Sequence, residues 1–441
     1  MQRAEAVPLA LAEVGPGRTM AIGLITLAVL TGTAARYALS PMQELVKADL
    51  GLGDNQVALL QGMAIALPTA LMSIPVGRLV DRANRMRLLT VLALLCALGS
   101  VMTALAHGFA GAFVSRMLVC AAVVAAQPAA LSLVSDLTAP AERGRMITLV
   151  SLGQAVGATL AYILAGVLLD WLPAQAPLLT GGALAGMAPW RVVQLLFGLG
   201  VLAAAVALFT LREPARQEAG TAAAQDLRAT LAALWSYRLL LLPLAVGMIS
   251  IGMADAAAGI WAVPILTRVF HLAPSDFATW LGVLNLGSSV AGALIGGLAA
   301  DLGQRGRGQA GALMGALLGA VLSVPAALFP VMPGVVPFAV LLGVLLGAGA
   351  CVNIAATSAV MVLLPNRLRG MCISVLVAMI GLVAFGIAPL LVSFSSHWSA
   401  RGGDLTTPLA VVGVATSLAA VAAFIRAMRV AQHMQQGETH A

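Results

Sequence analysis

The sequence predicts an all-α membrane protein with twelve transmembrane helices in two pseudo-symmetric six-helix bundles. Of its 441 residues, 61% are hydrophobic and 9% are charged, and the mean hydropathy is +0.99. One loop pattern also occurs twice, because Gly77–Arg87 is echoed by Gly297–Arg307. Asp81 and Asp301 within the two copies lie 220 residues apart, about half of the chain. Such an internal repeat indicates a duplication, so the helices divide into two bundles.

The twelve spans follow from the length of the apolar stretches. Crossing the hydrocarbon core takes about 20 mostly apolar residues per helix. We expect the first six spans at residues 19–39, 55–76, 88–106, 109–133, 147–169 and 191–211. We expect the second six at residues 239–262, 277–300, 310–330, 336–363, 371–393 and 407–427. Internal glycines and prolines are compatible with these helices, because neighbouring helices satisfy the backbone groups that they free.

The two halves align at nearly constant offsets, and a polar stretch separates them. Asp81 aligns with Asp301, and Asp54 aligns with Asp276; the latter two are expected to cap the helices that follow them. The seam contains a candidate surface helix near Leu227–Trp235. We predict an N-terminal bundle at residues 1–211, a cytoplasmic linker at 212–238, and a C-terminal bundle with a short cytoplasmic tail at 239–441.

The basic residues predict the orientation. Of the 24, 23 are arginine, and placing both termini in the cytoplasm puts most of them on the inner side. This asymmetry agrees with the positive-inside rule. We therefore expect a multi-pass protein of a bacterial inner membrane with both termini cytoplasmic. The pI near 10 reflects this topology and contact with anionic lipids, and it does not predict a nucleic-acid partner.

The sequence predicts neither an enzyme nor a metal or cofactor site. The four cysteines fall in expected spans and form no Cys-x-x-Cys pair, while the five histidines fall in short outer loops and the polar tail. The spans contain no histidine, no glutamate and only one aspartate from which to build an acid–base centre. A P-loop for ATP is also missing from the sequence.

The repeated loop has the properties of a conformational latch. Its glycine permits close backbone approach, and its aspartate can lie at a helix N-terminus or pair with arginine. The alternative is a plain positively charged inner loop, but two copies in corresponding positions favour the latch. We assign the latch to Gly77, Asp81, Arg82, Arg85, Arg143, Arg145, Asp301 and Arg305.

These residues resemble a known family. Gly77–Arg87 is similar to the signature G-x-x-x-D-R-x-G-R-x-R of the major facilitator superfamily, with Asn84 in place of the second glycine. Arg116 is similar to that family's membrane-embedded arginine. The first half also resembles the bacterial Spinster-like branch, for example at Pro128–Ser132 and Glu142–Arg145. The resemblance implies two bundles that rock around a central site, and a lysophospholipid or other lipid-like substrate.

Two departures from the Spinster-like pattern concern protons. That pattern places an aspartate directly before an arginine in the first span, which corresponds to Arg36 here. It also places a glutamate seven positions after an arginine in the fourth span, which corresponds to Arg116 here. This chain has Ala35 and Val123 at these positions. The proton coupling that the resemblance implies therefore lacks its carboxylates here. Uniport, anion exchange and proton symport are all compatible with the sequence.

Three ionisable side chains fall well inside the expected spans: Arg36, Arg116 and Asp255. Charges inside a membrane are costly and usually face a cavity or a partner. We expect Arg36 and Asp255 to form an outer gate, which the substrate opens by competing for the arginine. The alternatives are a static ion pair, or an Arg36 that snorkels to the interface. For Arg116 the alternative is a packing role, with bonds to backbone carbonyls.

The charge balance predicts the substrate class. Two arginines against one aspartate leave the centre net positive, which favours an anion such as a carboxylate or phosphate. The mostly apolar lining suits an amphiphilic anion, although the sparse polar side chains also fit interhelical hydrogen bonds. We expect substrate contacts from Arg36, Tyr37, Arg116, Gln127, Gln154 and Asn353.

Together these features predict a monomeric secondary transporter that moves a small or amphiphilic organic anion by rocker-switch alternating access. Its expected partners are this substrate and the membrane lipids, with protons as a further candidate. The alternative within transport is multidrug-type efflux of hydrophobic or cationic compounds, with Asp255 selecting cations. A third interpretation is a sensor that binds such a molecule without moving it.

Overall fold

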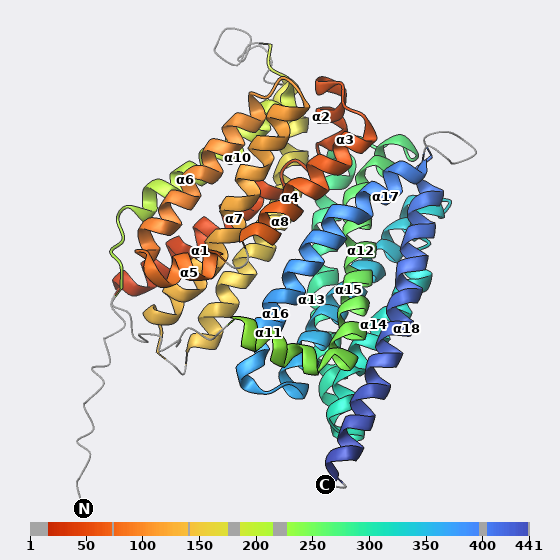
Figure 1. Cartoon of the computed structure of the whole chain (residues 1–441). Coiled ribbons are helices and arrows are strands. Elements are labelled where there is room, and N and C mark those ends of the chain that lie inside the picture. The colour runs from red at the N-terminus through yellow and green to blue at the C-terminus, as the bar shows by residue number, and fades with distance from the viewer. Residues whose placement is uncertain are drawn as a thin grey trace, which may run out of the picture.

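The computed structural model describes residues 16–72, 75–139, 142–174, 186–214, 227–396 and 404–439, and in these residues it contains helices and turns but no strand. Twelve helical segments are long and apolar enough to cross a membrane. The predicted fold class is therefore confirmed. Because the number of spans is even, α1 begins and α18 ends on the same side, which we call the termini side (Figure 1). The other is the opposite side.

The first half of the chain supplies six spans and two short helices (Figure 1). The spans are α1 (Pro16–Tyr37); α3 (Asp54–Ala58), the π-helical turn η1 (Leu59–Met63) and α4 (Ala64–Met72) in series; α6 (Arg85–Ala104); α7 (Phe109–Leu137); α8 (Arg143–Ala174); and α10 (Pro189–Leu208). The short helices are α2 (Gln43–Leu50) on the opposite side and α5 (Pro75–Arg82) on the termini side.

The second half supplies the other six spans after the helix α11 (Leu227–Ser236), which lies in the predicted linker and packs against α12 and α16. The spans are α12 (Arg238–Arg268); α13 (Pro274–Arg307); η2 (Gln309–Leu313), α14 (Met314–Ala326) and η3 (Phe329–Val331) in series; α15 (Val335–Leu363); α16 (Asn366–Ile380), the π-helical turn η4 (Gly381–Phe385) and α17 (Gly386–Ser396) in series; and α18 (Thr406–Thr439).

Small residues let the helices of each bundle approach closely, as is usual where lipid gives no hydrophobic drive for association. In the first bundle, a Cβ at Gly157 of α8 would lie 2.3 Å from the carbonyl oxygen of Leu30 in α1. In the second bundle, a Cβ at Gly292 of α13 would lie 2.0 Å from the carbonyl oxygen of Gly347 in α15. These positions are closed to any side chain, so they fix the spacing of the helices.

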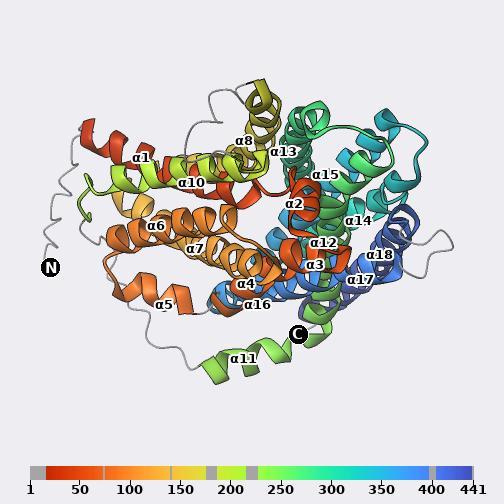
Figure 2. The ribbon, with the colours of Figure 1, turned by 90° about the horizontal axis from the view of Figure 1, so that it is seen from above.

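The two bundles lie side by side and meet along two helix pairs (Figure 2). In one pair, α8 packs against α13. In the other, the series α3–η1–α4 packs against η4 and α17. The closest approach in the second pair brings Gly62 of η1 against Phe385 of η4, where a Cβ would lie 2.3 Å from the Phe385 carbonyl oxygen. Pro389 has no N–H to donate to this carbonyl one turn earlier, so it is free to face the other bundle.

Two local expectations are wrong. Gly77–Arg87 was expected to be a loop, but Pro75–Arg82 forms the helix α5. Val76 and Val80, one helical turn apart, are buried on a small cluster that includes Ala129 of α7, and this burial explains the helix. Asp54 was expected to cap α3, but Gly53 is the cap residue, and its N–H donates to Gln56 Oε1 at 2.9 Å.

Candidate functional site

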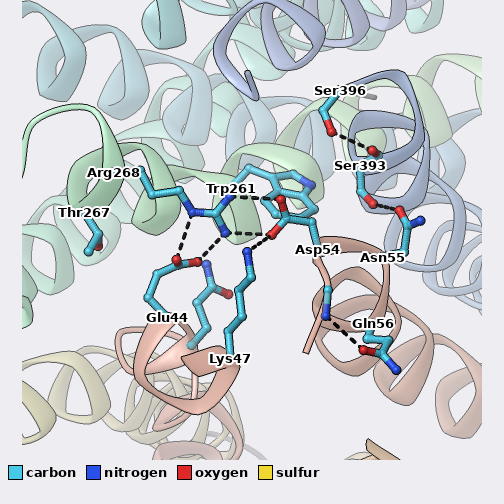
Figure 3. Close-up of polar contacts among 12 residues, drawn as sticks. Glu44, Lys47, Asp54, Asn55, Gln56, Trp261, Thr267, Arg268, Ser393 and Ser396 are labelled. Carbon is cyan, nitrogen blue, oxygen red and sulfur yellow. Dashed lines mark hydrogen bonds and ion pairs between the residues drawn. The ribbon is translucent and has the colours of Figure 1, made fainter. Parts of the chain in front are cut away.

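Ion pairs join the two bundles on the opposite side (Figure 3). Arg268, at the end of α12 in the second bundle, donates to both oxygens of Glu44 at 2.8 and 2.9 Å and to both oxygens of Asp54 at 2.7 and 3.0 Å. Lys47 of the first bundle lies 2.5 Å from the same Asp54. The cluster is only partly exposed, and both pairings are bidentate, the geometry in which arginine binds carboxylates most strongly. It therefore holds the opposite side of the two bundles together.

Hydrogen bonds extend this contact inward from the ion pairs. Ser393 of α17 donates to the side-chain oxygen of Asn55 in α3, which joins the bundles a second time (Figure 3). Trp261 of α12, fully buried, donates through Nε1 to the Pro389 carbonyl at 3.1 Å and ties two helices of the second bundle together beside the seam. The closed contact thus runs from the helix ends into the membrane span.

Two of the predicted charged residues lie in contact. Arg116 of α7 is 2% exposed, and its Nη1 donates to the backbone carbonyl of Arg36 in α1. Its Nη2 donates to Gln61 Oε1 at 2.8 Å. In this structure Arg116 makes bonds to a backbone carbonyl and a buried amide, and its predicted contact with substrate stays a prediction. The Arg36 side chain is half-buried and lies over the Tyr37 ring at 5.4 Å, and it has no acidic partner among the described residues.

A chain of buried glutamines leads from Arg116 to the second bundle. Gln61 Nε2 donates to Gln43 Oε1 at 3.2 Å, and Gln43 Nε2 donates to the backbone carbonyl of Ile260 in α12 at 2.7 Å. Gln61 and Gln43 are 2% and 3% exposed. The chain therefore connects the embedded arginine to the seam without passing through water.

An apolar pocket lies between α1, α6, α7 and α10, on the termini side of Arg36 and Arg116. Gly32 and Thr33 of α1 and Val123 and Gln127 of α7 line it, together with aliphatic side chains of α6 and α10. The Thr33 hydroxyl is buried in this wall without a hydrogen-bond partner. Val123 therefore puts a hydrocarbon surface where the Spinster-like pattern has a carboxylate.

The other predicted contact residues are spread over several helices. Asp255 of α12 is half-buried, and its carboxylate packs against Gly349 of α15. No ion pair joins Asp255 to Arg36 in the described part of the chain, so the predicted gate between them stays a prediction. Gln154 of α8 is half-buried, and Asn353 of α15 is exposed. The structure brings Arg36, Tyr37 and Arg116 together and leaves Asp255, Gln154 and Asn353 apart from them.

The predicted latch residues occupy different surroundings in the two halves. Arg85 of the first half is buried and pairs with Asp136 at 2.5 Å and with Glu213 at 3.2 Å. Asp301 and Arg305 of the second half are exposed, as are Arg82 and Arg145, while Arg143 is half-buried. The surroundings of Gly77 and of the Asp81 side chain lie outside what the structure describes. The latch as a whole stays a prediction.

Twelve spans in two bundles, joined on one side by ion pairs and carrying a buried arginine inside a span, are the architecture of a membrane transport protein. The chain belongs to the Major Facilitator Superfamily, whose family model matches residues 24–328. The resemblance drawn from the repeated loop is thereby confirmed.

Solved structures and curated relatives agree with this family. The chain is similar to a bacterial homologue of the human lysosomal transporter Spinster in an inward-facing, unoccupied conformation, with a TM-score of 0.78, 20% identity, and 95% and 97% of the two chains covered. It is also similar to the nucleoside transporter NupG, with a TM-score of 0.68, 12% identity, and 93% and 99% covered. These likenesses show the fold.

Two curated relatives are named triacylglyceride transporters. The protein of Mycolicibacterium hassiacum is 32% identical over 163 residues, and that of Mycolicibacterium smegmatis is 31% identical over 163 residues. Each match covers 35% of this chain, but only 29% and 28% of the respective relative. The chain therefore matches less than a third of these relatives' length.

Sequence reasoning missed the residues that close the opposite side. Neither Arg268 nor Glu44 was among the predicted site residues. The available signal was the run of charges between the first and second spans, together with a single arginine at the end of the seventh span. For Gln43 the only signal was Pro264, which leaves a carbonyl free one turn earlier in α12.

Proposed function

We propose that this protein is a secondary transporter that moves an anionic amphiphile across the membrane by alternating access. The single observation that carries the proposal is the Arg36 side chain, half-buried in the last turn of α1 and without an acidic partner among the described residues. An unpaired charge inside a membrane is costly and is a functional candidate by default. A carboxylate or phosphate group would offset it.

Arg36 and the apolar pocket together suit a molecule with a charged head and a hydrocarbon chain. Gly32 and Thr33 of the pocket wall lie within about one helical turn of Arg36 on α1. A head group on Arg36 would direct its hydrocarbon chain toward Val123 and the aliphatic side chains of α6, where the pocket has to widen to admit it. Arg116 positions Arg36 through the backbone carbonyl and adds to the positive potential. Tyr37 and Gln127 supply polar contacts on either side of this point.

The names of similar proteins support an apolar substrate. Two relatives are called triacylglyceride transporters. A triacylglyceride carries no charge, so Arg36 favours an acidic lipid such as a lysophospholipid over a neutral one. A small carboxylate is the simpler member of the same class.

The orientation and partners follow the same proposal. The termini side carries most of the arginines, so we place it in the cytoplasm of a bacterial cell, with residues 1–211 and 239–441 as the moving bundles. The ion-paired side then faces outward and is closed. In this closed state no ion pair joins Arg36 to Asp255 among the described residues, so we propose the Arg36–Asp255 gate as a separate contact. The latch residues close the cytoplasmic side in the other state. The monomer is the working unit, without catalysis, metal or cofactor, and Ala35 and Val123 leave the driving ion open.

A second candidate is efflux of hydrophobic cations. The observation in its favour is Asp255, a half-buried carboxylate inside α12 with no ion-pair partner among the residues described. A lipophilic cation would pair with it. The anion is favoured because Arg36 and Arg116 outnumber Asp255 at the centre.

Ligand-induced stabilisation of the purified protein tests the proposal. A ligand at 100 times its Kd raises the free energy of unfolding by about 2.7 kcal/mol, and therefore raises Tm by a few degrees. The probes are a lysophosphatidic acid and an alkyltrimethylammonium salt of the same chain length. We expect saturable stabilisation by the acid in the wild type and in Arg305→Gln, an exposed control, and none in Arg36→Gln. Stabilisation by the ammonium salt alone, lost in Asp255→Asn, would establish the efflux alternative.

A further inference from the structure

The glutamine chain has only one possible direction. Arginine can only donate, so Gln61 must turn its oxygen to Arg116 and its amide N–H toward Gln43. Gln43 must in turn present its oxygen to Gln61 and its N–H to Ile260. The fixed ends thus settle both amide orientations. Aligned hydrogen bonds that begin at a charge strengthen one another, and they do so most in a buried setting.

The far end of the chain exists because of a proline. Pro264 lies inside α12 and has no N–H, so the carbonyl of Ile260, four residues earlier, receives no bond from it. A buried carbonyl without a donor is costly. Gln43 supplies the donor from the other bundle at 2.7 Å. This bond exists only while the two bundles are in contact on the opposite side.

The glutamine chain also lies next to the ion pairs that join the two bundles on the opposite side. Gln43 and Glu44 are consecutive residues at the start of α2, and Ile260 and Arg268 lie on the same helix, about two turns apart. Gln43 and Glu44 therefore hold α12 at two points. The glutamine bond is the buried one, and it leads to Arg116.

We propose that Gln61 and Gln43 are positioning residues that couple the state of Arg116 to closure of the opposite side. This inference rests on the proposed function, because it takes the anionic substrate as the group that perturbs Arg116. An anion that reaches the arginine pair competes with Gln61 Oε1 for the Arg116 guanidinium. The Gln61 side chain then rotates, and Gln43 Oε1 loses the hydrogen bond that it accepts from Gln61. The hydrogen bond from Gln43 Nε2 to the Ile260 carbonyl weakens as a result. Substrate binding thereby lowers the cost of opening the opposite side.

The distance between the bundles on this side tests the inference directly. Spin labels at Leu45 of α2 and Ala273 before α13 are both at exposed positions, and the four native cysteines are buried and free. One hydrogen bond is worth about a five-fold change in a conformational ratio. Molecules whose opposite side is open give a longer distance between the two labels. We expect Gln61→Leu and Gln43→Leu each to raise the population with this long distance about five-fold. Gln194→Leu, a buried glutamine of α10 outside the chain, should leave it unchanged.

Pro264→Ala gives a test that touches neither glutamine. The new N–H bonds Ile260 within α12 and removes the need for Gln43, so the long-distance population should rise as in Gln43→Leu while the fold gains helix stability. If Gln61→Leu and Pro264→Ala give the same distribution of label distances as the control Gln194→Leu, the inference is overturned. Lysophosphatidic acid should lengthen the distance in the wild type but not in Gln61→Leu. Failure of this probe to stabilise the wild type refutes the proposed substrate, while the ligand-free distances still decide the role of the glutamines.

Discussion

Arg268 Nη2 of the second bundle lies 2.7 Å from Asp54 Oδ1 of the first bundle, although the two residues are 214 positions apart in sequence. The pairing is bidentate and shared with Glu44. It joins the two bundles on the opposite side of the molecule. Two partly exposed ion pairs cross the boundary at this point, and both belong to Arg268.

Arg268→Gln should open this side. The change leaves Glu44 and Asp54 close together without their shared cation, which adds repulsion to the lost attraction. For a partly exposed cluster we expect a loss of about 1 kcal/mol in favour of the open state. Spin-label distances between α2 and the loop before α13 measure it. Lys47→Gln is the matched control, because Lys47 binds the same Asp54 from within one bundle; an equal effect of both changes would show that Arg268 does not hold the seam.

Gly62→Ala should block transport while the protein stays folded. Its Cβ would lie 2.3 Å from the Phe385 carbonyl oxygen of the other bundle, so the bundles cannot reach their present contact. Gly157→Ala meets the Leu30 carbonyl at the same 2.3 Å, but within one bundle. We expect it to lower the free energy of unfolding by about 1–3 kcal/mol. Thermal unfolding separates the two variants, and an equal loss of Tm in both would contradict this view of the seam.

Val123→Phe should select against long chains. The larger ring fills the pocket beside Gly32 and removes room for a hydrocarbon tail. We expect binding of a long-chain lysophosphatidic acid to weaken at least about ten-fold, the effect of roughly 1.4 kcal/mol of lost contact. Binding of a short alkyl phosphate should change little. If both ligands weaken equally, the pocket does not hold the tail.

Arg85→Gln should destabilise the first bundle, whereas Arg305→Gln should not. Arg85 is 4% exposed and lies against Asp136 and Glu213, and its loss removes the ion pairs that it makes with both acids. Removing one partner of a buried ion pair costs about 3 kcal/mol or more. Arg305 is exposed in the other copy of the loop. Thermal unfolding of both variants checks the contrast, and similar Tm values would mean that the Arg85 cluster contributes no stability.

Hydropathy, the repeat and the positive-inside pattern were enough to predict the twelve spans and the two bundles, because these depend on properties local to each segment. Arg36 and Arg116 were singled out because charges inside a membrane are rare, and their role in binding stays a prediction. The helix α5 was missed because burial of Val76 and Val80 depends on where α7 lies. Nothing local to Arg268 reveals a partner 214 residues away.

The glutamine chain shows the same limit from the other direction. Gln43 and Gln61 are ordinary in sequence, and most polar side chains in spans serve interhelical hydrogen bonds. Their order becomes visible only once Arg116, which can only donate, and the Ile260 carbonyl, freed by Pro264, are placed at its two ends.

Flux of an anionic amphiphile into sealed vesicles distinguishes a transporter from a sensor and tests the role of Arg36 at once. Purified protein is reconstituted, and uptake of a fluorescent lysophosphatidic acid is measured for the wild type, Arg36→Gln and Gly62→Ala. We predict saturable uptake by the wild type and no uptake by either variant. Of the two variants, Gly62→Ala should still bind the ligand and Arg36→Gln should not. Binding without uptake in the wild type, or uptake that persists in Arg36→Gln, would contradict an anion transporter centred on Arg36.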